Sequence, residues 1–206
     1  MRQFYDATLE ALATSPFLLA MPVPAEIRTP RFVLRRWCAE DARALLPVLE
    51  ANFAHLSPWI PARVATPVPL PMLAARLAGF GNDFATAKEW RYGLFSPDET
   101  TVLGEAGIYP RAASGRVAYA DATHVELGYW LRADETGKGL VTEATKLLLD
   151  IVATLDRVSH VEIRCDARNA PSAAIPRRLG FRLATTISEA SKPEVGLQVW
   201  TLDLPY

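Results

Sequence analysis

The sequence predicts an α/β domain with a mixed sheet, and three observations support this prediction. Apolar and polar residues alternate over 125–131, which is the period of a strand with two different faces. Strand patterns also occur on both sides of this stretch, as expected for a mixed sheet. Directly after it, apolar residues recur at helical spacing and predict one buried stripe, at Leu140, Ala144, Leu147, Ile151 and Leu155.

The first 26 residues are predicted to be an N-terminal appendage to a domain formed by residues 27–206. A short helix fits residues 3–13, and four prolines within 14–30 favour an extended arm. The elements expected in the domain follow in chain order. They are a strand at 31–37, a helix at 40–53 that Pro47 should kink or split, a proline-rich loop at 55–71, a helix between 71 and 88 interrupted near Gly79 and Gly81, strands at 90–95, 102–109 and 125–131, a helix from 140 to 155, a strand at 160–166, a short helix at 172–179, and strands at 181–187 and 195–202.

Composition excludes several classes of protein. No stretch approaches the roughly 18 uninterrupted apolar residues of a membrane span, and Asp6 and Glu10 do not suit a signal peptide, so we expect no membrane contact. Cys38 and Cys165 are too few for a disulfide framework, so free thiols in the cytoplasm are expected. A formal net charge of −1 provides no basic field for nucleic acid.

The stretch 136–144 (TGKGLVTEA) predicts an anion site. Gly137 and Gly139 lie where the helix begins, so backbone N–H groups and the helix dipole can face a phosphate or pyrophosphate. An ordinary tight turn is the alternative. A Walker loop is absent from the sequence, and a dinucleotide fingerprint would need glycine in place of Thr142.

This loop resembles the acyl-CoA loop of the GNAT N-acetyltransferases, Gln/Arg-x-x-Gly-x-Gly/Ala. Within that family the chain resembles the branch of the ribosomal-protein alanine N-acetyltransferases (RimJ/RimL-like). Thr136 and Val141 depart from that pattern. Four further segments carry the resemblance, which covers about residues 27–202. They are residues 29–37 (TPRFVLRRW), 55–61 (HLSPWIP), 125–131 (VELGYWL) and 169–181, which includes Asn169, Ser172 and Leu179-Gly180-Phe181.

The resemblance implies a mixed, mostly antiparallel central sheet flanked by helices, with a splayed strand at the acyl-CoA site. It also implies acetyl-CoA as the cosubstrate, direct transfer in a ternary complex, and no metal. Lys138 and Arg177 could contact the phosphates of the cofactor, or they could be solvated surface cations. The residues expected at the cofactor are the backbone of Tyr129, Trp130 and Leu131, the loop residues Thr136, Gly137, Lys138, Gly139, Leu140, Val141 and Thr142, and Asn169, Ser172 and Arg177.

Acetyl transfer to an amine requires a base for the amine and can use an acid for the departing thiolate. Glu126 is the candidate base, because strand alternation points it to the face opposite Val125, and His124 and Glu105 are its rivals. In the resembled branch a serine at the place of Ser172 lies beside the CoA sulfur, so Ser172 is the candidate acid. Helix capping would also explain Ser172, and Pro176 could displace it.

The predicted function is transfer of an acetyl group from acetyl-CoA to a primary amine, and the branch resemblance favours a protein or peptide N-terminal α-amino group. A small amine such as an antibiotic or polyamine, and a noncatalytic acyl-CoA-binding module, remain alternatives. Trp59 and Trp130 could line the acceptor site or belong to the core. A deep acidic cavity would favour polyamines, whereas an open groove would favour a peptide terminus. Both a monomer and a homodimer are compatible with the sequence.

Overall fold

The computed structural model describes residues 22–189 and 192–204. The helix expected at 3–13 lies outside the described residues, and the appendage stays a prediction. Within residues 22–26 the chain already packs on the domain, because Val23 is 2% exposed and the Tyr92 hydroxyl donates a hydrogen bond to the Pro24 carbonyl at 2.8 Å. The packed part of the chain therefore extends at least to Val23.

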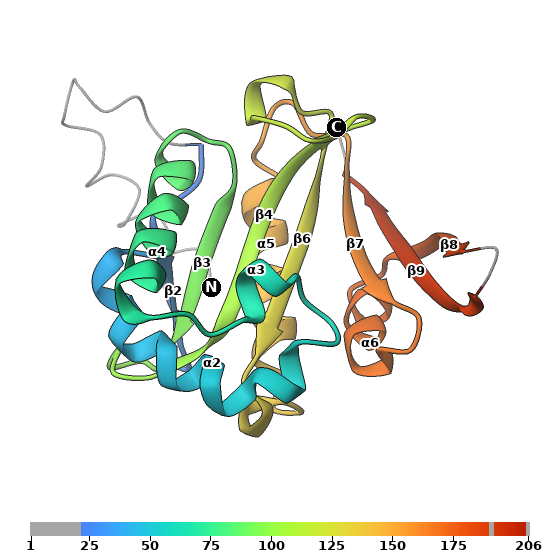
Figure 1. Cartoon of the computed structure of the whole chain (residues 1–206). Helices are drawn as coiled ribbons and strands as arrows, with labels where there is room; N and C mark the ends of the chain where they lie inside the picture. Colours follow the sequence, from blue (N-terminus) through green and yellow to red (C-terminus); the bar gives the residue numbers. More distant parts are fainter. Residues whose placement is uncertain (1–21, 190–191, 205–206) are drawn as a thin grey trace, which may run out of the picture.

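The centre of the fold is a single sheet that is antiparallel except where β6 and β7 run parallel (Figure 1). Its strand order is β1-β2-β3-β4-β6-β7-β9-β8, and β5 pairs with β4 beside this path. The predicted mixed, mostly antiparallel sheet is confirmed. The strands are β1 (Glu26–Arg28), β2 (Val33–Arg36), β3 (Trp90–Phe95), β4 (Val102–Ala112), β5 (Gly115–Arg116), β6 (His124–Leu131), β7 (His160–Asp166), β8 (Arg182–Glu189) and β9 (Lys192–Asp203).

Helices cover the two faces of the sheet, with α2, α3 and α4 in front and α5 behind in the view of Figure 1. Apolar side chains of α5 join one core cluster with those of β3, β4, β6 and β7, whereas α2 and α4 enclose a second cluster on the other face. Among the described residues, no helix is long and apolar enough to cross a membrane. The helices are α2 (Ala42–Leu56), α3 (Ala62–Ala65), α4 (Leu70–Ala85), α5 (Leu140–Val152) and α6 (Ala170–Arg178).

Several helical predictions need correction. Pro47 lies inside α2 without splitting it, and a kink there stays a prediction. The helix α4 continues through Gly79 and Gly81, because its buried side chains hold it against the sheet on both sides of the glycines. The loop expected at 55–71 contains α3. The short strands β1 and β5 carried no recognisable alternation and were not predicted.

The buried stripe of α5 matches the predicted one in part. Leu140, Ala144 and Leu155 are buried as predicted, whereas Leu148 and Val152 are buried in place of Leu147 and Ile151, which are only partly buried. Both sets of residues are apolar, so periodicity alone could not decide which of the two faces the sheet.

Strands β6 and β7 pair only near their beginnings. The parallel register comprises Val125 with Val161, Glu126 with Glu162, and Leu127 with Ile163, although β6 continues to Leu131 and β7 to Asp166. The remaining parts of the two strands diverge, which confirms the predicted splayed strand.

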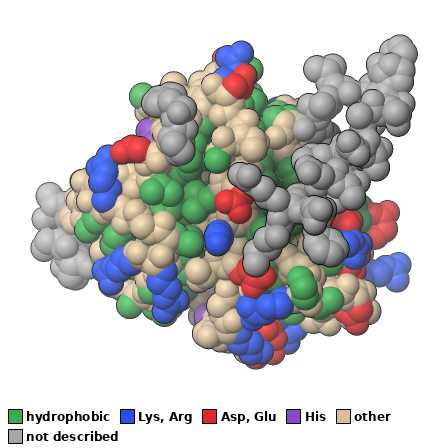
Figure 2. Space-filling view, turned by 180° about the vertical axis from the view of Figure 1, so that it is seen from behind, with side chains coloured by type: hydrophobic (Ala, Val, Ile, Leu, Met, Phe, Trp, Pro, Cys, Tyr) green, Lys and Arg blue, Asp and Glu red, His purple; other side chains and the backbone are tan. Residues whose placement is uncertain are grey.

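The back of the molecule carries side chains of both charge signs. On the uncovered part of the face in Figure 2, acidic and basic side chains occur close to one another, in keeping with the net charge of −1. This visible part therefore presents no extended surface of a single sign.

Two glycine substitutions test the packing of α4 and of the strand pair β4 and β6, and they should change stability in opposite directions. Gly79→Ala should stabilise the protein by about 0.5–1 kcal/mol, because a Cβ there meets nothing within 4 Å and alanine favours a continuous α4. Gly104→Ala should destabilise it by about 1–3 kcal/mol, because its Cβ would lie 2.1 Å from the Trp130 carbonyl oxygen on β6. Urea unfolding measures both changes. A destabilised Gly79→Ala protein would contradict the uninterrupted helix, and a neutral Gly104→Ala would contradict the tight contact of β4 with β6.

Candidate active site

The glycine loop forms the N-terminus of α5, as predicted. Gly137 and Gly139 have φ values of 76° and 80°, in the left-handed region that side chains rarely adopt, and Gly139 is the N-cap. A Cβ on either glycine would meet nothing within 4 Å. The backbone conformation therefore requires glycine, and open space remains above a helix start whose first N–H groups face outward.

Arg31, for which the sequence suggested no role, anchors this loop. One guanidinium nitrogen donates to the Lys138 carbonyl at 2.7 Å and another to the Glu143 carboxylate at 2.8 Å. The start of the domain thus holds the glycine loop in place, although 107 residues separate Arg31 from Lys138. The Lys138 ammonium lies 3.0 Å from Glu135, and the Thr136 hydroxyl donates to the Ala133 carbonyl, so contacts of both side chains with a phosphate stay predictions.

The diverging end of β6 offers backbone groups to a ligand. The Arg132 N–H donates to the Leu103 carbonyl on β4, and successive residues of a strand direct their N–H and C=O groups to opposite sides. Trp130 therefore bonds toward β4, opposite Glu105, whereas Tyr129 and Leu131 face the gap beside β7. The backbone groups of Trp130 are directed to β4, so they do not fit the expected contact with the cofactor. Those of Tyr129 and Leu131 are directed to the gap and do fit it.

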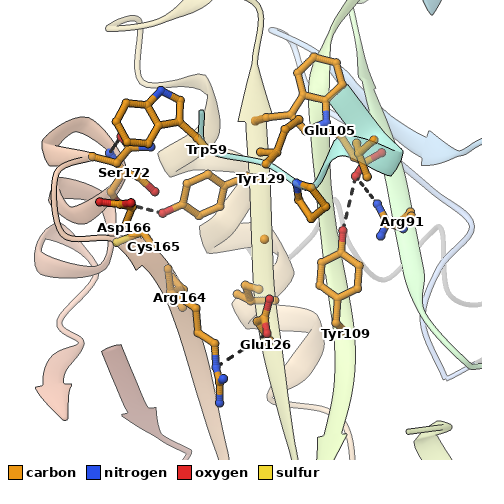
Figure 3. Close-up of a pocket in the computed structure, with 18 of the residues that line it drawn as sticks. Trp59, Arg91, Glu105, Tyr109, Glu126, Tyr129, Arg164, Cys165, Asp166 and Ser172 are labelled. Carbon is orange, nitrogen blue, oxygen red and sulfur yellow. Dashed lines mark hydrogen bonds and ion pairs between the residues drawn. The ribbon is translucent and has the colours of Figure 1, made fainter. Parts of the chain in front are cut away.

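At the start of α6 the capping residue is Asn169 rather than Ser172. The Asn169 side-chain oxygen accepts the Ser172 backbone N–H at 3.1 Å, which leaves the Ser172 hydroxyl without a capping role. The Tyr129 hydroxyl donates to the Ser172 carbonyl at 3.1 Å, across the gap between β6 and α6 (Figure 3). Burial raises the pKa of Tyr129, so the phenol stays protonated and keeps this bond.

The C-terminal part of α6 is continuous as well. Pro176 is buried within the helix, and the Arg177 guanidinium lies 5.2 Å from the centre of the Trp200 ring. Pro176 therefore does not displace Ser172 by ending the helix early. The cation–π contact gives Arg177 a structural partner, and its contact with the cofactor stays a prediction.

A cavity of about 160 Å³ lies between the loop after α2, the strands β4, β6 and β7, and the start of α6. Five predicted site residues line it together, namely Glu126, Tyr129, Trp130, Asn169 and Ser172. The glycine loop, His124 and Arg177 are not among its lining residues. The predicted acid and base thus share one cavity, and the glycine loop forms a separate part of the site.

Glu126 lies in the wall of this cavity with arginines around it. Its side chain is 13% exposed, and its carboxylate oxygens accept hydrogen bonds from Arg111 at 2.7 Å and Arg116 at 3.4 Å. Arg164 lies 3.9 Å away (Figure 3). These neighbours orient the carboxylate and balance its charge.

The two rival bases have other roles. Glu105 also lines the cavity, but it is only 5% exposed and accepts hydrogen bonds from Trp37 at 3.0 Å and from Arg91 at 2.8 Å, so it belongs to a buried ion pair. His124 is buried outside the cavity wall, and burial lowers its pKa. The geometry therefore favours Glu126 among the three candidates.

Tyr109 shapes the cavity floor, which sequence reasoning did not foresee. A Cβ on Gly107 or Gly128, which face each other across β4 and β6, would come within 2.8 or 3.0 Å of the Tyr109 side chain. The Arg116 guanidinium lies 4.0 Å from the ring centre. In the sequence, Gly107 and Gly128 are the signal that could have indicated an aromatic ring lying flat on the sheet. That they face each other could be known only from the strand register.

Cys165 also lines the cavity and was predicted only as a free thiol. It is 7% exposed, and burial raises its pKa, so the thiol stays protonated and weakly nucleophilic. This disfavours an acyl-cysteine intermediate. Of the two tryptophans, Trp59 is exposed at the cavity, while Trp130 both lines it and belongs to the second core cluster.

Comparisons with known proteins show the family and the fold of the chain. Residues 31–182 match the family described as acetyltransferase (GNAT) domain. The [ribosomal protein uS5]-alanine N-acetyltransferase of Escherichia coli is 26% identical over 155 residues, which cover 75% of this chain and 77% of that protein.

Solved structures share the fold. The microcin C7 self immunity acetyltransferase MccE, in complex with acetyl-CoA and AMP, aligns with a TM-score of 0.73 and 18% identity, over 89% of this chain and 99% of that one. The ribosomal alpha-N-protein acetyltransferase RimL, in complex with coenzyme A, aligns with a TM-score of 0.72 and 16% identity, over 88% and 97%.

Gly139→Asp tests the anion site. The substitution places a Cβ and a negative charge at a left-handed position where phosphate oxygens would approach, so acetyl-CoA binding should be lost. Gly180→Asp is the matched control. Gly180 has a similar φ of 83° but follows the C-terminal end of α6, so this variant should retain acetyl-CoA binding. Calorimetry with acetyl-CoA, after a check of the melting temperature, gives the answer. Wild-type affinity in folded Gly139→Asp would remove the phosphate site from the glycine loop.

Proposed function

Since the chain belongs to the GNAT acetyltransferase family, we propose that this acetyl-CoA-dependent enzyme acetylates a primary amine, namely the N-terminal α-amino group of a protein or peptide. The observation that carries the proposal is the meeting of Glu126 and Ser172 in one cavity beside the unpaired end of β6. The Escherichia coli relative, an alanine N-acetyltransferase of a ribosomal protein, supports this choice of acceptor.

The charges of the cavity argue against a polycationic acceptor. Its lining contains three arginines, Arg91, Arg116 and Arg164, and three carboxylates, Glu105, Glu126 and Asp166. Such a balanced wall has no excess negative charge to attract a polyamine or an aminoglycoside. An acceptor with one amine on a largely neutral chain suits it better. A small amine with a single positive charge is the second candidate, since the balanced wall would not repel it.

In the proposed reaction, Glu126 and Ser172 each transfer a proton. Glu126 accepts a proton from the acceptor ammonium, and the freed nitrogen forms the new bond to the acetyl carbon. As the carbon–sulfur bond breaks, Ser172 donates its hydroxyl proton to the departing sulfur and recovers a proton from the nitrogen, which loses its second proton on forming the amide. The first N–H groups of α5 bind phosphate. Acetyl-CoA supplies the acetyl group, and the products are the amide and the free CoA thiol. Because Cys165 stays protonated, we propose direct transfer without an acyl-enzyme.

An acceptor panel tests the proposal directly. Release of free thiol from acetyl-CoA is measured with peptides that begin with alanine or serine, with the same peptides blocked at the N-terminus, and with spermidine. We expect release only with the free N-termini. Faster release with spermidine would favour the small-amine alternative, and no release with any amine would favour a noncatalytic binding module.

Glu126→Gln should lower turnover by about 10²- to 10⁴-fold, because it removes the proton acceptor and preserves the side-chain shape. Acetyl-CoA affinity should not change. Glu89→Gln is the matched control, since Glu89, immediately before β3, is also a buried, arginine-paired carboxylate and does not line the cavity. A Glu126→Gln enzyme that keeps wild-type turnover and the acidic limb of the pH–rate profile would exclude Glu126 as the base.

Ser172→Ala should separate chemistry from helix capping, because the cap belongs to Asn169. The substitution should leave the free energy of unfolding nearly unchanged and lower turnover by about 10²-fold or more. Asn169→Ala should instead destabilise the protein by about 0.5–2 kcal/mol. Unfolding curves and turnover measured on both variants provide the comparison, and full turnover in Ser172→Ala would end the general-acid assignment.

A further inference from the structure

A second group of chemically active side chains lies at the beginnings of β6 and β7, outside the cavity. His124 begins β6, His160 begins β7, and Glu162 follows on the same face of β7. One ligand atom from each lies within 4.8 Å of the others. His124 and Glu162 are buried and His160 is partly buried, so the group is shielded from most of the solvent.

The outer nitrogens of both rings point toward one carboxylate. His124 Nε2 lies 3.8 Å from Glu162 Oε2, and His160 Nε2 lies 3.8 Å from Oε1. Both distances are too long for hydrogen bonds. They match the spacing of about 3.4–3.8 Å between two atoms that each lie roughly 2.1 Å from one tetrahedral ion.

Hydroxyl groups hold the inner nitrogens of the same rings. Ser159 Oγ donates to the Thr123 carbonyl at 3.0 Å and lies 3.0 Å from His160 Nδ1. Because its proton is committed to the carbonyl, Ser159 accepts from His160 Nδ1–H, which leaves the lone pair on Nε2. Thr123 Oγ1 lies 3.0 Å from His124 Nδ1 and provides the corresponding contact. Partners of this kind fix the orientation of metal-binding histidines.

The carboxylate is oriented as well. Glu162 Oε2 accepts a hydrogen bond from Arg164 Nε at 2.9 Å, and Arg164 Nη2 lies 2.8 Å from the same oxygen in an ion pair. Oε1 faces His160. Ligating carboxylates are commonly held by such outer hydrogen bonds.

We propose that His124, His160 and Glu162 bind one Zn²⁺ ion, with water as its fourth ligand. Two imidazoles and one carboxylate are a donor set that zinc prefers. The two rings stack 4.6 Å apart at an angle of 9°, so at least one ring must tilt out of the stack to direct its lone pair at the ion. The sequence implied no metal for catalysis, and none of the three ligands lines the cavity, although Arg164 contacts both Glu162 and the proposed base Glu126.

The place of the site indicates a structural role. Only three residue pairs join β6 to β7, and His124 and His160 lie side by side immediately before the first pair. An ion there would fasten the closed end of the two strands whose other ends diverge at the cavity. Zinc should therefore raise the melting temperature, independently of any acetyl transfer.

The test uses untagged, chelator-treated protein titrated with ZnCl₂ alone, by calorimetry and by thermal unfolding. We expect one ion bound per chain and a higher melting temperature. His160→Gln should weaken binding by more than the ~10- to 100-fold that loss of an outer partner costs, and Ser159→Ala should fall within that range. His55→Gln is the control, since His55 is the third histidine of the chain and lies in α2.

Three results would overturn the proposal. One is wild-type protein that binds no zinc, which would leave an ordinary pair of histidines beside a glutamate. The second is unchanged binding in folded His160→Gln, and the third is loss of binding in Cys38→Ser. Cys38→Ser identifies a competing thiol site, because loss of binding in that variant would assign the ion to Cys38 and Asp41, whose side chains lie 3.2 Å apart.

Discussion

The short parallel pairing of β6 with β7 is the constraint on which the rest of the site depends. Because only three residue pairs join the strands, the second half of β6 keeps one side of its backbone unpaired inside the sheet. Unpaired N–H and C=O groups within a fold are costly unless a partner satisfies them. The two segments that follow the diverging strands are the glycine loop at the start of α5 and the helix α6, and both present helix N-termini near this opening (Figure 1). One irregularity of the sheet thus brings together the parts that an acyl-CoA requires.

Charge on the front of the sheet is arranged so that the cavity is polar and nearly neutral. Glu105 and Arg91 form a buried pair with the Tyr109 hydroxyl 3.4 Å from the carboxylate, while Glu126 is held by arginines from β4, β5 and β7. Removing one member of such a network leaves a buried charge unpaired. We infer that acceptor specificity arises from shape, with Tyr109 flat on its two glycines, more than from a net field.

The sequence predicted those features that depend on local pattern. Alternation located β3 and β7 at their observed bounds, and the glycine spacing located the start of α5. The sequence pattern could not decide which apolar face of α5 is buried, since Leu147 and Leu148 are equally apolar. It also could not show that α4 continues through Gly79. The site residues that it missed depend on register. Arg31 acts on Lys138 through tertiary contact, Tyr109 needs Gly107 opposite Gly128, and the assignment of the α6 cap to Asn169 needs side-chain geometry.

Amide hydrogen exchange of β6, measured residue by residue with and without acetyl-CoA, tests the central claim most directly. The account predicts that acetyl-CoA slows exchange at Tyr129 and Leu131, whose N–H groups face the gap, and leaves Trp130 unchanged, because its N–H is directed to β4. Slower exchange should also appear in the first turn of α5. Bound acetyl-CoA with no change at Tyr129 and Leu131 would contradict the claim that the unpaired end of β6 binds the cofactor.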